Sequence, residues 1–133
     1  MSNKHGIVYI RGTKRNTFCV LIDGSDQKVK ISSSVGSISP DKASPYVTTK
    51  LLAQYFVQRL IDLKYVRVSV VLRGLGVGRG VVINSLRNSG LHLHTIKDTT
   101  LSPHNGCRPP KVRRKKFRTR VSFKIKKFLS LRF

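Results

Sequence analysis

The strongest candidate for chemistry in this chain is a glycine-rich segment at residues 74–79, which reads Gly-Leu-Gly-Val-Gly-Arg. Glycines between a strand and a helix let backbone N–H groups approach a phosphate, and the helix N-terminus adds a favourable partial charge. A dinucleotide fingerprint needs a glycine where Arg79 stands, and a Walker A loop needs Gly-Lys followed by Ser or Thr. Neither pattern is complete here. Arg79 directly after the glycines favours a polynucleotide backbone as the ligand, and a tight strand-to-helix turn is the alternative interpretation.

A second candidate lies at residues 102–111, which read Ser-Pro-His-Asn-Gly-Cys-Arg-Pro-Pro-Lys and lead into a basic cluster at residues 113–116. Asn105-Gly106 predicts a turn, and Pro109-Pro110 holds the chain extended. An extended, proline-stiffened segment loses less conformational entropy when it binds in a groove. We interpret it as an arm that contacts nucleic acid. A solvated charge cluster or a localisation signal is the alternative.

Metal ligands and catalytic nucleophiles are sparse. His104 and Cys107 could form half of a zinc site, but no second pair with ligand spacing follows, and His92 and His94 lack a third ligand. A Cys107 nucleophile with His104 as its base would need an orienting group on a rigid scaffold, which a basic tail does not provide. Cys19 lies in an apolar strand pattern and is predicted to be a core residue. We therefore expect no metal, no cofactor and no small-molecule substrate.

Acidic residues are too few for a carboxylate-based enzyme. The 133 residues contain 27 Lys and Arg against five Asp and no Glu, a formal net charge of +22. A two-metal nuclease gathers several carboxylates around two Mg²⁺ ions, and only Asp23, Asp62 and Asp98 lie near predicted element ends. A nuclease is thus an alternative hypothesis, and we expect no enzymatic activity. The excess positive charge instead indicates a polyanionic partner, because released counterions favour such binding.

Charge also divides the chain into a module and a basic arm. Residues 99–133 carry 12 of the 27 basic residues and no acid, whereas the first 98 residues carry every Asp. We predict an α/β domain at 1–98, an extended Pro-, Arg- and Lys-rich tail at 99–115, and a basic amphipathic extension at 116–133. The extension fits a strand or a helix equally well. It could bind a membrane surface or pack on an added protein, and we favour the second. No apolar run approaches the roughly 18 residues that cross a bilayer.

The elements that position these motifs alternate between strands and helices. Short β-branched and aromatic runs predict strands at residues 6–10, 17–23 and 28–32, with a hairpin loop at 12–16. After a Ser- and Gly-rich loop at 33–44, Ser44-Pro45 indicates a helix start, and apolar residues recur at helical spacing as far as Leu63. A strand at 66–72, a short helix ending before Gly90 and a strand at 91–98 follow. The order β-β-β-α-β-α-β predicts an α/β fold with a mixed five-stranded sheet and two helices.

These residues resemble the universal small-subunit ribosomal protein eleven family, in its bacterial and organellar form. The resemblance runs from about residue 6 to residue 115 and is strongest at residues 74–79, 89–91 and 103–111. It implies a ribonuclease H-like layout and a structural role in the small ribosomal subunit. It also implies a position on the platform beside the messenger RNA exit, with small-subunit rRNA and neighbouring platform proteins as partners. The alternatives are a nuclease and a cationic membrane-surface protein.

The resemblance further implies where the chain contacts RNA. The matching positions lie in the first hairpin, in the glycine-rich loop and in the tail. The predicted rRNA-binding residues are Lys14, Arg15, Asn16, Gly76, Gly78, Arg79, His104, Asn105, Arg108, Lys111, Arg113, Arg114 and Lys115.

The chain departs from the family pattern in several places. Leu75 and Leu101 stand where the family usually has proline, and the loop at 33–44 carries only Lys42 with Asp41 where the family usually has glycines and arginines. The chain also continues for 18 residues after Lys115. The Phe-, Lys-, Leu- and Ser-rich extension and the lack of a presequence pattern indicate an organelle-encoded protein. We predict the mitochondrion, with the plastid and then a bacterial cytoplasm as alternatives.

Overall fold

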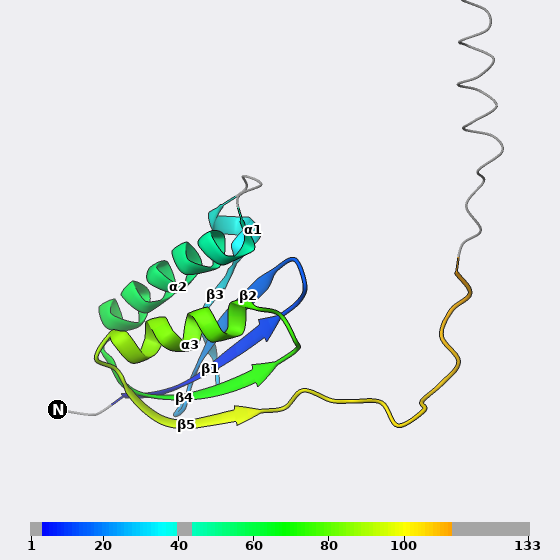
Figure 1. The fold of residues 1–133 in the computed structure, drawn as a ribbon. Helices are drawn as coiled ribbons and strands as arrows, with labels where there is room; N and C mark the ends of the chain where they lie inside the picture. The colour runs from blue at the N-terminus through cyan, green and yellow to red at the C-terminus, as the bar shows by residue number, and fades with distance from the viewer. Residues whose placement is uncertain (1–3, 40–43, 113–133) are drawn as a thin grey trace, which may run out of the picture. The chain divides into compact units, whose positions relative to one another are not determined.

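Five strands form one mixed sheet in the computed structural model of the chain, which describes residues 4–39 and 44–112. In chain order the elements are β1 (Lys4–Gly12), β2 (Thr17–Asp23), β3 (Val29–Ser34), α1 (Val35–Ile38), α2 (Pro45–Asp62), β4 (Tyr65–Arg73), α3 (Gly78–Asn88) and β5 (His92–Asp98) (Figure 1). The strands lie in the order β3-β2-β1-β4-β5. β2 is antiparallel to both β1 and β3, whereas β4 is parallel to both β1 and β5. The predicted α/β fold with a mixed five-stranded sheet is confirmed.

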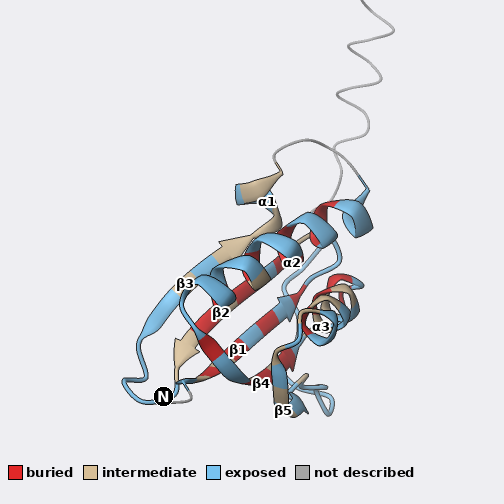
Figure 2. Ribbon diagram, turned by 90° about the vertical axis from the view of Figure 1, so that its left-hand side faces the viewer, coloured by how far each residue is buried: buried red, intermediate tan, exposed pale blue. Residues whose placement is uncertain are grey.

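The hydrophobic core lies between one face of this sheet and the two longer helices (Figure 2). Alternation along the strands places Val8 and Ile10 of β1 and Val68 and Val70 of β4 on that face, and all four are buried. Cys19 pairs with Ile10 across the sheet and is buried with it. Burial raises the pKa of its thiol to about 12, because the thiolate would lose its hydration. The prediction that Cys19 is a core residue is confirmed.

Helix α2 covers the sheet with one of its two apolar stripes. Leu52, Phe56 and Leu60 recur every four residues, so they lie on one side of the helix, and all three are buried. Val47 and Leu51 belong to the second stripe and are exposed. The helix begins at Pro45 after Ser44, as the sequence predicts. Periodicity therefore identified the helix, but it did not distinguish the buried stripe from the exposed one.

A one-turn helix, α1, stands where the sequence predicts only a loop. The hydroxyl of Ser37 accepts a hydrogen bond from the Ser34 amide at 3.1 Å and donates one to the Ser34 carbonyl at 2.7 Å. Val35 and Ile38 are partly buried against the core. These local hydrogen bonds and two apolar contacts stabilise the turn, although its Ser- and Gly-rich composition favours a loop.

The chain divides into two compact units after Ser102. Within the first unit, the Thr99 amide donates to the Leu72 carbonyl at 2.9 Å, so the chain beyond β5 remains bonded to β4. The predicted three-part division stays a prediction, and the extension at 116–133 lies outside the described residues. No helix among the described residues is long and apolar enough to cross a membrane.

Candidate nucleic-acid interface

The β1–β2 hairpin ends in a closed loop that presents two cations. The Thr13 amide donates to the Asn16 carbonyl at 2.8 Å, and the Thr13 hydroxyl accepts from the Asn16 amide at 3.0 Å. The side-chain oxygen of Asn16 accepts from the Thr17 amide at 2.8 Å. Lys14 and Arg15 lie at the tip, are exposed, and form no ion pair with any described residue. The loop therefore holds two uncompensated positive charges on a turn of fixed shape.

The glycine-rich loop packs backbone against backbone on this hairpin. The Gly76 amide donates to the Gly12 carbonyl at 3.2 Å, and a Cβ added at Gly76 would lie 2.7 Å from the Gly12 carbonyl carbon. A Cβ at Gly74, where φ is +91°, would collide with the Gly12 carbonyl oxygen. One at Gly78 would collide with the Thr17 hydroxyl. The three glycines are thus required for close approach of the loop to the hairpin. Of the two interpretations of this segment, a phosphate-binding loop and a tight strand-to-helix turn, this packing supports the turn.

Burial alternates along the glycine-rich loop. Gly76 and Gly78 are buried, whereas Leu75 and Val77 are 83% and 76% exposed. Packing against the hairpin accounts for both buried glycines without a ligand. RNA contact at Gly76 and Gly78 therefore stays a prediction, and the exposed part of the loop is apolar.

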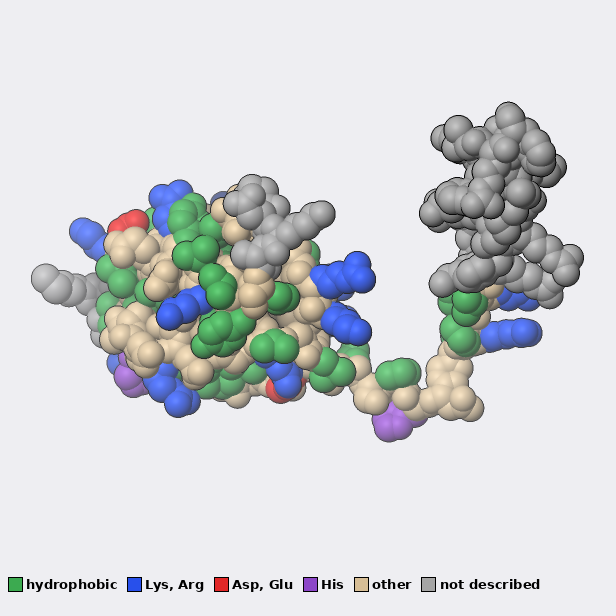
Figure 3. Space-filling model, turned by 45° about the horizontal axis from the view of Figure 1, so that its top comes forward, with side chains coloured by type: hydrophobic (Ala, Val, Ile, Leu, Met, Phe, Trp, Pro, Cys, Tyr) green, Lys and Arg blue, Asp and Glu red, His purple; other side chains and the backbone are tan. Residues whose placement is uncertain are grey.

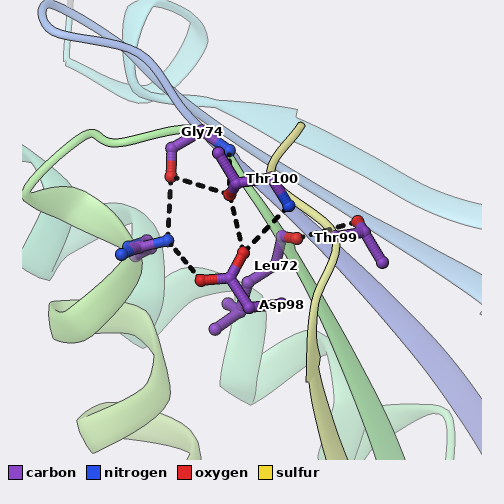
Figure 4. A network of polar contacts seen from close by, with 6 residues as sticks. Leu72, Gly74, Asp98, Thr99 and Thr100 are labelled. Atoms are coloured by element: carbon purple, nitrogen blue, oxygen red, sulfur yellow. Dashed lines mark hydrogen bonds and ion pairs between the residues drawn. The ribbon is translucent and has the colours of Figure 1, made fainter. Parts of the chain in front are cut away.

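Arg79 is bonded to the chain's own loop and strand end, in a polar network around Gly74, Asp98 and Thr100 (Figure 4). Its Nη1 donates to the Gly74 carbonyl at 2.9 Å and to the Asp98 carboxylate at 2.8 Å. Asp98 also accepts the Thr100 hydroxyl at 2.6 Å and the Thr100 amide at 3.0 Å. The Thr100 hydroxyl in turn accepts from the Gly74 amide at 3.0 Å. One polar network therefore joins the glycine-rich loop, the start of α3 and the end of β5.

The network pairs Arg79 with an ionised carboxylate but uses only part of its guanidinium. Hydrogen bonds from the Thr100 hydroxyl and amide lower the pKa of Asp98, with a smaller contribution from Arg79, so the carboxylate stays ionised at neutral pH. Both contacts of Arg79 use Nη1, which leaves Nε and Nη2 without a hydrogen bond to the described residues. Lys and Arg side chains project from several sides of the domain, and acidic ones are few (Figure 3). The guanidinium of Arg79 thus keeps donors for a ligand beside a positively charged surface.

Residues 103–112 of the tail are exposed throughout and form no helix or strand. Asn105 has a φ of +60°, in the left-handed region, and Gly106 follows it, as expected of the predicted Asn-Gly turn. His104, Arg108 and Lys111 are exposed along this segment. The predicted RNA-binding residues that lie outside the described residues are Arg113, Arg114 and Lys115.

Comparison with known proteins gives one family for this chain. The sequence model of the family described as Ribosomal protein S11 matches residues 6–114. The chain belongs to this family. The small ribosomal subunit protein uS11c of Bigelowiella natans is 41% identical over 111 residues, which cover 82% of this chain and 85% of that protein. The uS11 protein of Ureaplasma parvum is 40% identical over 113 residues, or 84% and 93% of the two chains. The uS11c protein of Tupiella akineta is 36% identical over 111 residues, or 82% and 85%.

Membership of the S11 family confirms the predicted resemblance and the prediction that the chain is not an enzyme, because the family is structural and non-enzymatic. The nuclease alternative also fails on geometry. Asp23 pairs with Gly6 near the start of β1, whereas Asp98 pairs with Leu72 near the end of β4. Parallel pairing of β1 with β4 places these two carboxylates at opposite ends of the sheet. Among the described residues no three His, Cys, Asp or Glu side chains gather as metal ligands.

Three residues that shape this S11 site do not stand out in the sequence for that role. Asp98, Thr99 and Thr100 connect the end of β5 to β4 and to Arg79. The Arg79–Asp98 contact depends on the parallel register of β4 and β5, which periodicity cannot supply. One usable signal is Asp-Thr-Thr at the end of a predicted strand, because Asp readily accepts hydrogen bonds from the amide two residues on.

Proposed function

We propose that this chain is a structural component of the small ribosomal subunit and that it binds small-subunit rRNA. Its relatives are named as proteins of that subunit. The observation that carries the proposal is the hairpin loop, locked against the glycine-rich loop, with the charges of Lys14 and Arg15 uncompensated at its tip. RNA presents a dense row of phosphates, and cations held on a fixed loop neutralise those phosphates at defined positions.

Each predicted contact residue has a role in this proposal. Lys14 and Arg15 neutralise phosphates, and Asn16 keeps their loop closed. Arg79 donates from the guanidinium nitrogens that Asp98 leaves free. Gly76 and Gly78 contribute the close packing that gives the loop its shape.

The tail supplies the second part of the interface. His104, Asn105, Arg108 and Lys111 follow one another along an exposed segment, and the basic cluster at 113–115 continues it in the sequence. We propose that the tail threads between RNA segments and becomes ordered as it binds. Phosphate contacts then hold it in place, with proline limiting the conformational entropy that binding removes.

Within the subunit we propose a position on the platform, beside the messenger RNA exit region. Neighbouring platform proteins are its protein partners, and the messenger RNA path runs nearby. The extension at 116–133 packs on an added ribosomal protein. These assignments rest on the resemblance to the family.

The compartment is an organelle in this proposal. Relatives named uS11c favour the plastid over the mitochondrion that the sequence predicts. Immunoblotting of purified plastids and mitochondria for this chain distinguishes the two organelles, and a signal in neither one contradicts an organellar ribosome.

Sedimentation of a native lysate through a sucrose gradient, in high salt with Mg²⁺, tests the ribosomal role. We expect the chain to migrate with the small subunit, and a signal only at the top of the gradient would contradict the proposal. Purified protein provides a second test. If about 6–10 phosphates are contacted, affinity for rRNA falls about 10³- to 10⁵-fold between about 50 and 200 mM salt. A flat salt response is incompatible with phosphate neutralisation.

A further inference from the structure

The sheet has a second face that no described helix or strand covers (Figure 1). This open face comprises every second residue of β1 from His5 to Arg11, with the cross-strand partners of those residues in β2 and β4. Its apolar residues near the centre, such as Ile7 and Val20, are half-buried between their neighbours. Tyr9 and Phe18 are the exceptions in β1 and β2, being 42% and 38% exposed. The open face therefore presents two aromatic rings rather than a broad aliphatic patch.

The two rings lie beside two arginines. Phe18 pairs with Arg11 across β1 and β2, and Arg11 pairs with Arg73 across β1 and β4, so the three side chains form one row. Tyr9 is in the next row on the same face, opposite Val20. It is thus a diagonal neighbour of Phe18, and diagonal positions of an antiparallel pair are about 7–8 Å apart. Arg11 and Arg73 are exposed and form no ion pair with any described residue.

Acidic side chains are absent from the described part of this face. Asp23 lies on the helix-covered side of the sheet, where its carboxylate accepts a hydrogen bond from the Tyr65 hydroxyl at 2.8 Å. Asp98 contacts Arg79 of α3, Asp62 ends α2, and Asp26 lies in the turn after β2. The open face thus carries only positive charge from side chains. A polyanion complements such a face, whereas a protein partner would need an acidic surface.

We propose that the open face binds unpaired nucleotides of RNA, with bases stacked on Tyr9 and Phe18 and phosphates held by Arg11 and Arg73. This inference rests on the proposed rRNA binding and adds a second surface to the hairpin and the tail. Single-stranded RNA is recognised where bases stack on exposed aromatic rings next to cations. A duplex hides its base faces, so the open face binds single-stranded RNA more tightly than duplex RNA.

Binding of oligouridine and of an RNA duplex of matched length to the full chain, at one fixed salt concentration, tests the proposal. The double substitution Tyr9→Leu with Phe18→Leu keeps apolar side chains but removes both rings. Stacking contributes roughly fivefold to more than a hundredfold in affinity per base, so we expect at least about a tenfold loss for oligouridine. Duplex affinity stays unchanged. Tyr46→Leu is the matched control, because Tyr46 is an exposed tyrosine on α2.

A fluorescent variant provides a direct readout of stacking. The chain contains no tryptophan, so Tyr9→Trp introduces a single emitter on the open face. We expect oligouridine to quench its emission and to bind this variant as tightly as the original chain. Emission that does not change at saturating oligouridine would overturn the inference, whatever the folding of the leucine variants.

The arginines are tested by salt dependence. Arg11→Gln lowers the slope of log affinity against log salt for single strands by about 0.7, as expected for one lost phosphate contact. Arg87→Gln, at an exposed position of α3, serves as its control.

A chain that binds no RNA at all refutes the proposed function itself. If hairpin and tail variants lose RNA while the leucine variants bind both RNAs normally, rRNA binding stands and the open face is a surface for something other than RNA.

Discussion

Replacement of Gly76 by alanine tests the packing that holds the hairpin and the glycine-rich loop together. The added Cβ would meet the carbonyl oxygen of Thr13 and lie 2.7 Å from the carbonyl carbon of Gly12. Both neighbours are backbone atoms, so no side-chain rotation relieves the contact, and the two loops must separate. Separation also breaks the hydrogen bond from the Gly76 amide to the Gly12 carbonyl.

The magnitude follows from these two contributions. Overpacking at a closely packed position destabilises a protein by about 1–3 kcal/mol, and the lost hydrogen bond adds about 1 kcal/mol. We therefore expect Gly76→Ala to lower the free energy of unfolding by about 2–4 kcal/mol. For a domain of this size, that lowers the Tm by on the order of 10 °C or more.

The assay is urea unfolding followed by circular dichroism, with Gly80→Ala as the matched control. A Cβ at Gly80 meets nothing within 4 Å, and Gly80 lies in α3. Alanine there should raise the free energy of unfolding by about 0.5–1 kcal/mol, because glycine loses more backbone entropy in a helix. Opposite signs for the two variants support the packing argument. A Gly76→Ala protein within about 0.5 kcal/mol of the original chain would refute it.

Three further predictions concern the acid stability, the hairpin and the Asp98 network. Hydrogen bonds from the Ser25 amide and hydroxyl and from Tyr65 lower the pKa of Asp23 to about 2. The stability that this carboxylate contributes is thus fully present above its ordinary pKa of 3.8 and is lost as the pH falls through about 2. When the free energy of unfolding, measured with urea, is plotted against pH, Tyr65→Phe should make its decrease at acidic pH less steep. Lys14→Gln and Arg15→Gln should each reduce the salt slope of binding to structured rRNA by about 0.9 without changing the Tm, and a greater loss of stability than of affinity would contradict their role. Asp98→Asn should accelerate hydrogen exchange at the Gly74 and Thr100 amides while β1 keeps its protection, and unchanged exchange would show that the network does not hold the strand end.

Much of the fold is predictable from local pattern. Local residue patterns, mainly β-branched and aromatic runs with alternation in β4, identified all five strands. Ser44-Pro45 and Gly90 marked a helix start and a helix end. Helix α1 was not predictable, because the Ser37 hydroxyl, bonded to the backbone of Ser34, and two apolar contacts stabilise four residues of low helical propensity.

The candidate site is less accessible to sequence reasoning. The family resemblance indicated Lys14 and Arg15, and the glycines that directly precede Arg79 indicated that residue. Position 76 requires glycine because its backbone contacts that of Gly12, 64 positions away. This contact exists only once β1 and β4 pair in register. Asp98 similarly gains its partner through tertiary structure. Contacts between distant segments determine these roles, and no local pattern encodes them.

Strand β3 lies at the edge of the sheet, and this has a consequence for the chain before it meets RNA. An exposed edge with unpaired backbone groups can recruit a strand from another copy and begin aggregation. Val29 of β3 is 57% exposed, but Lys28 and Lys30 flank it, and the ladder with β2 is irregular between Leu21 and Ile22. Edge lysines and register irregularities are devices that oppose such pairing. A newly synthesised chain can therefore remain monomeric during the interval before assembly, when its edge is still open.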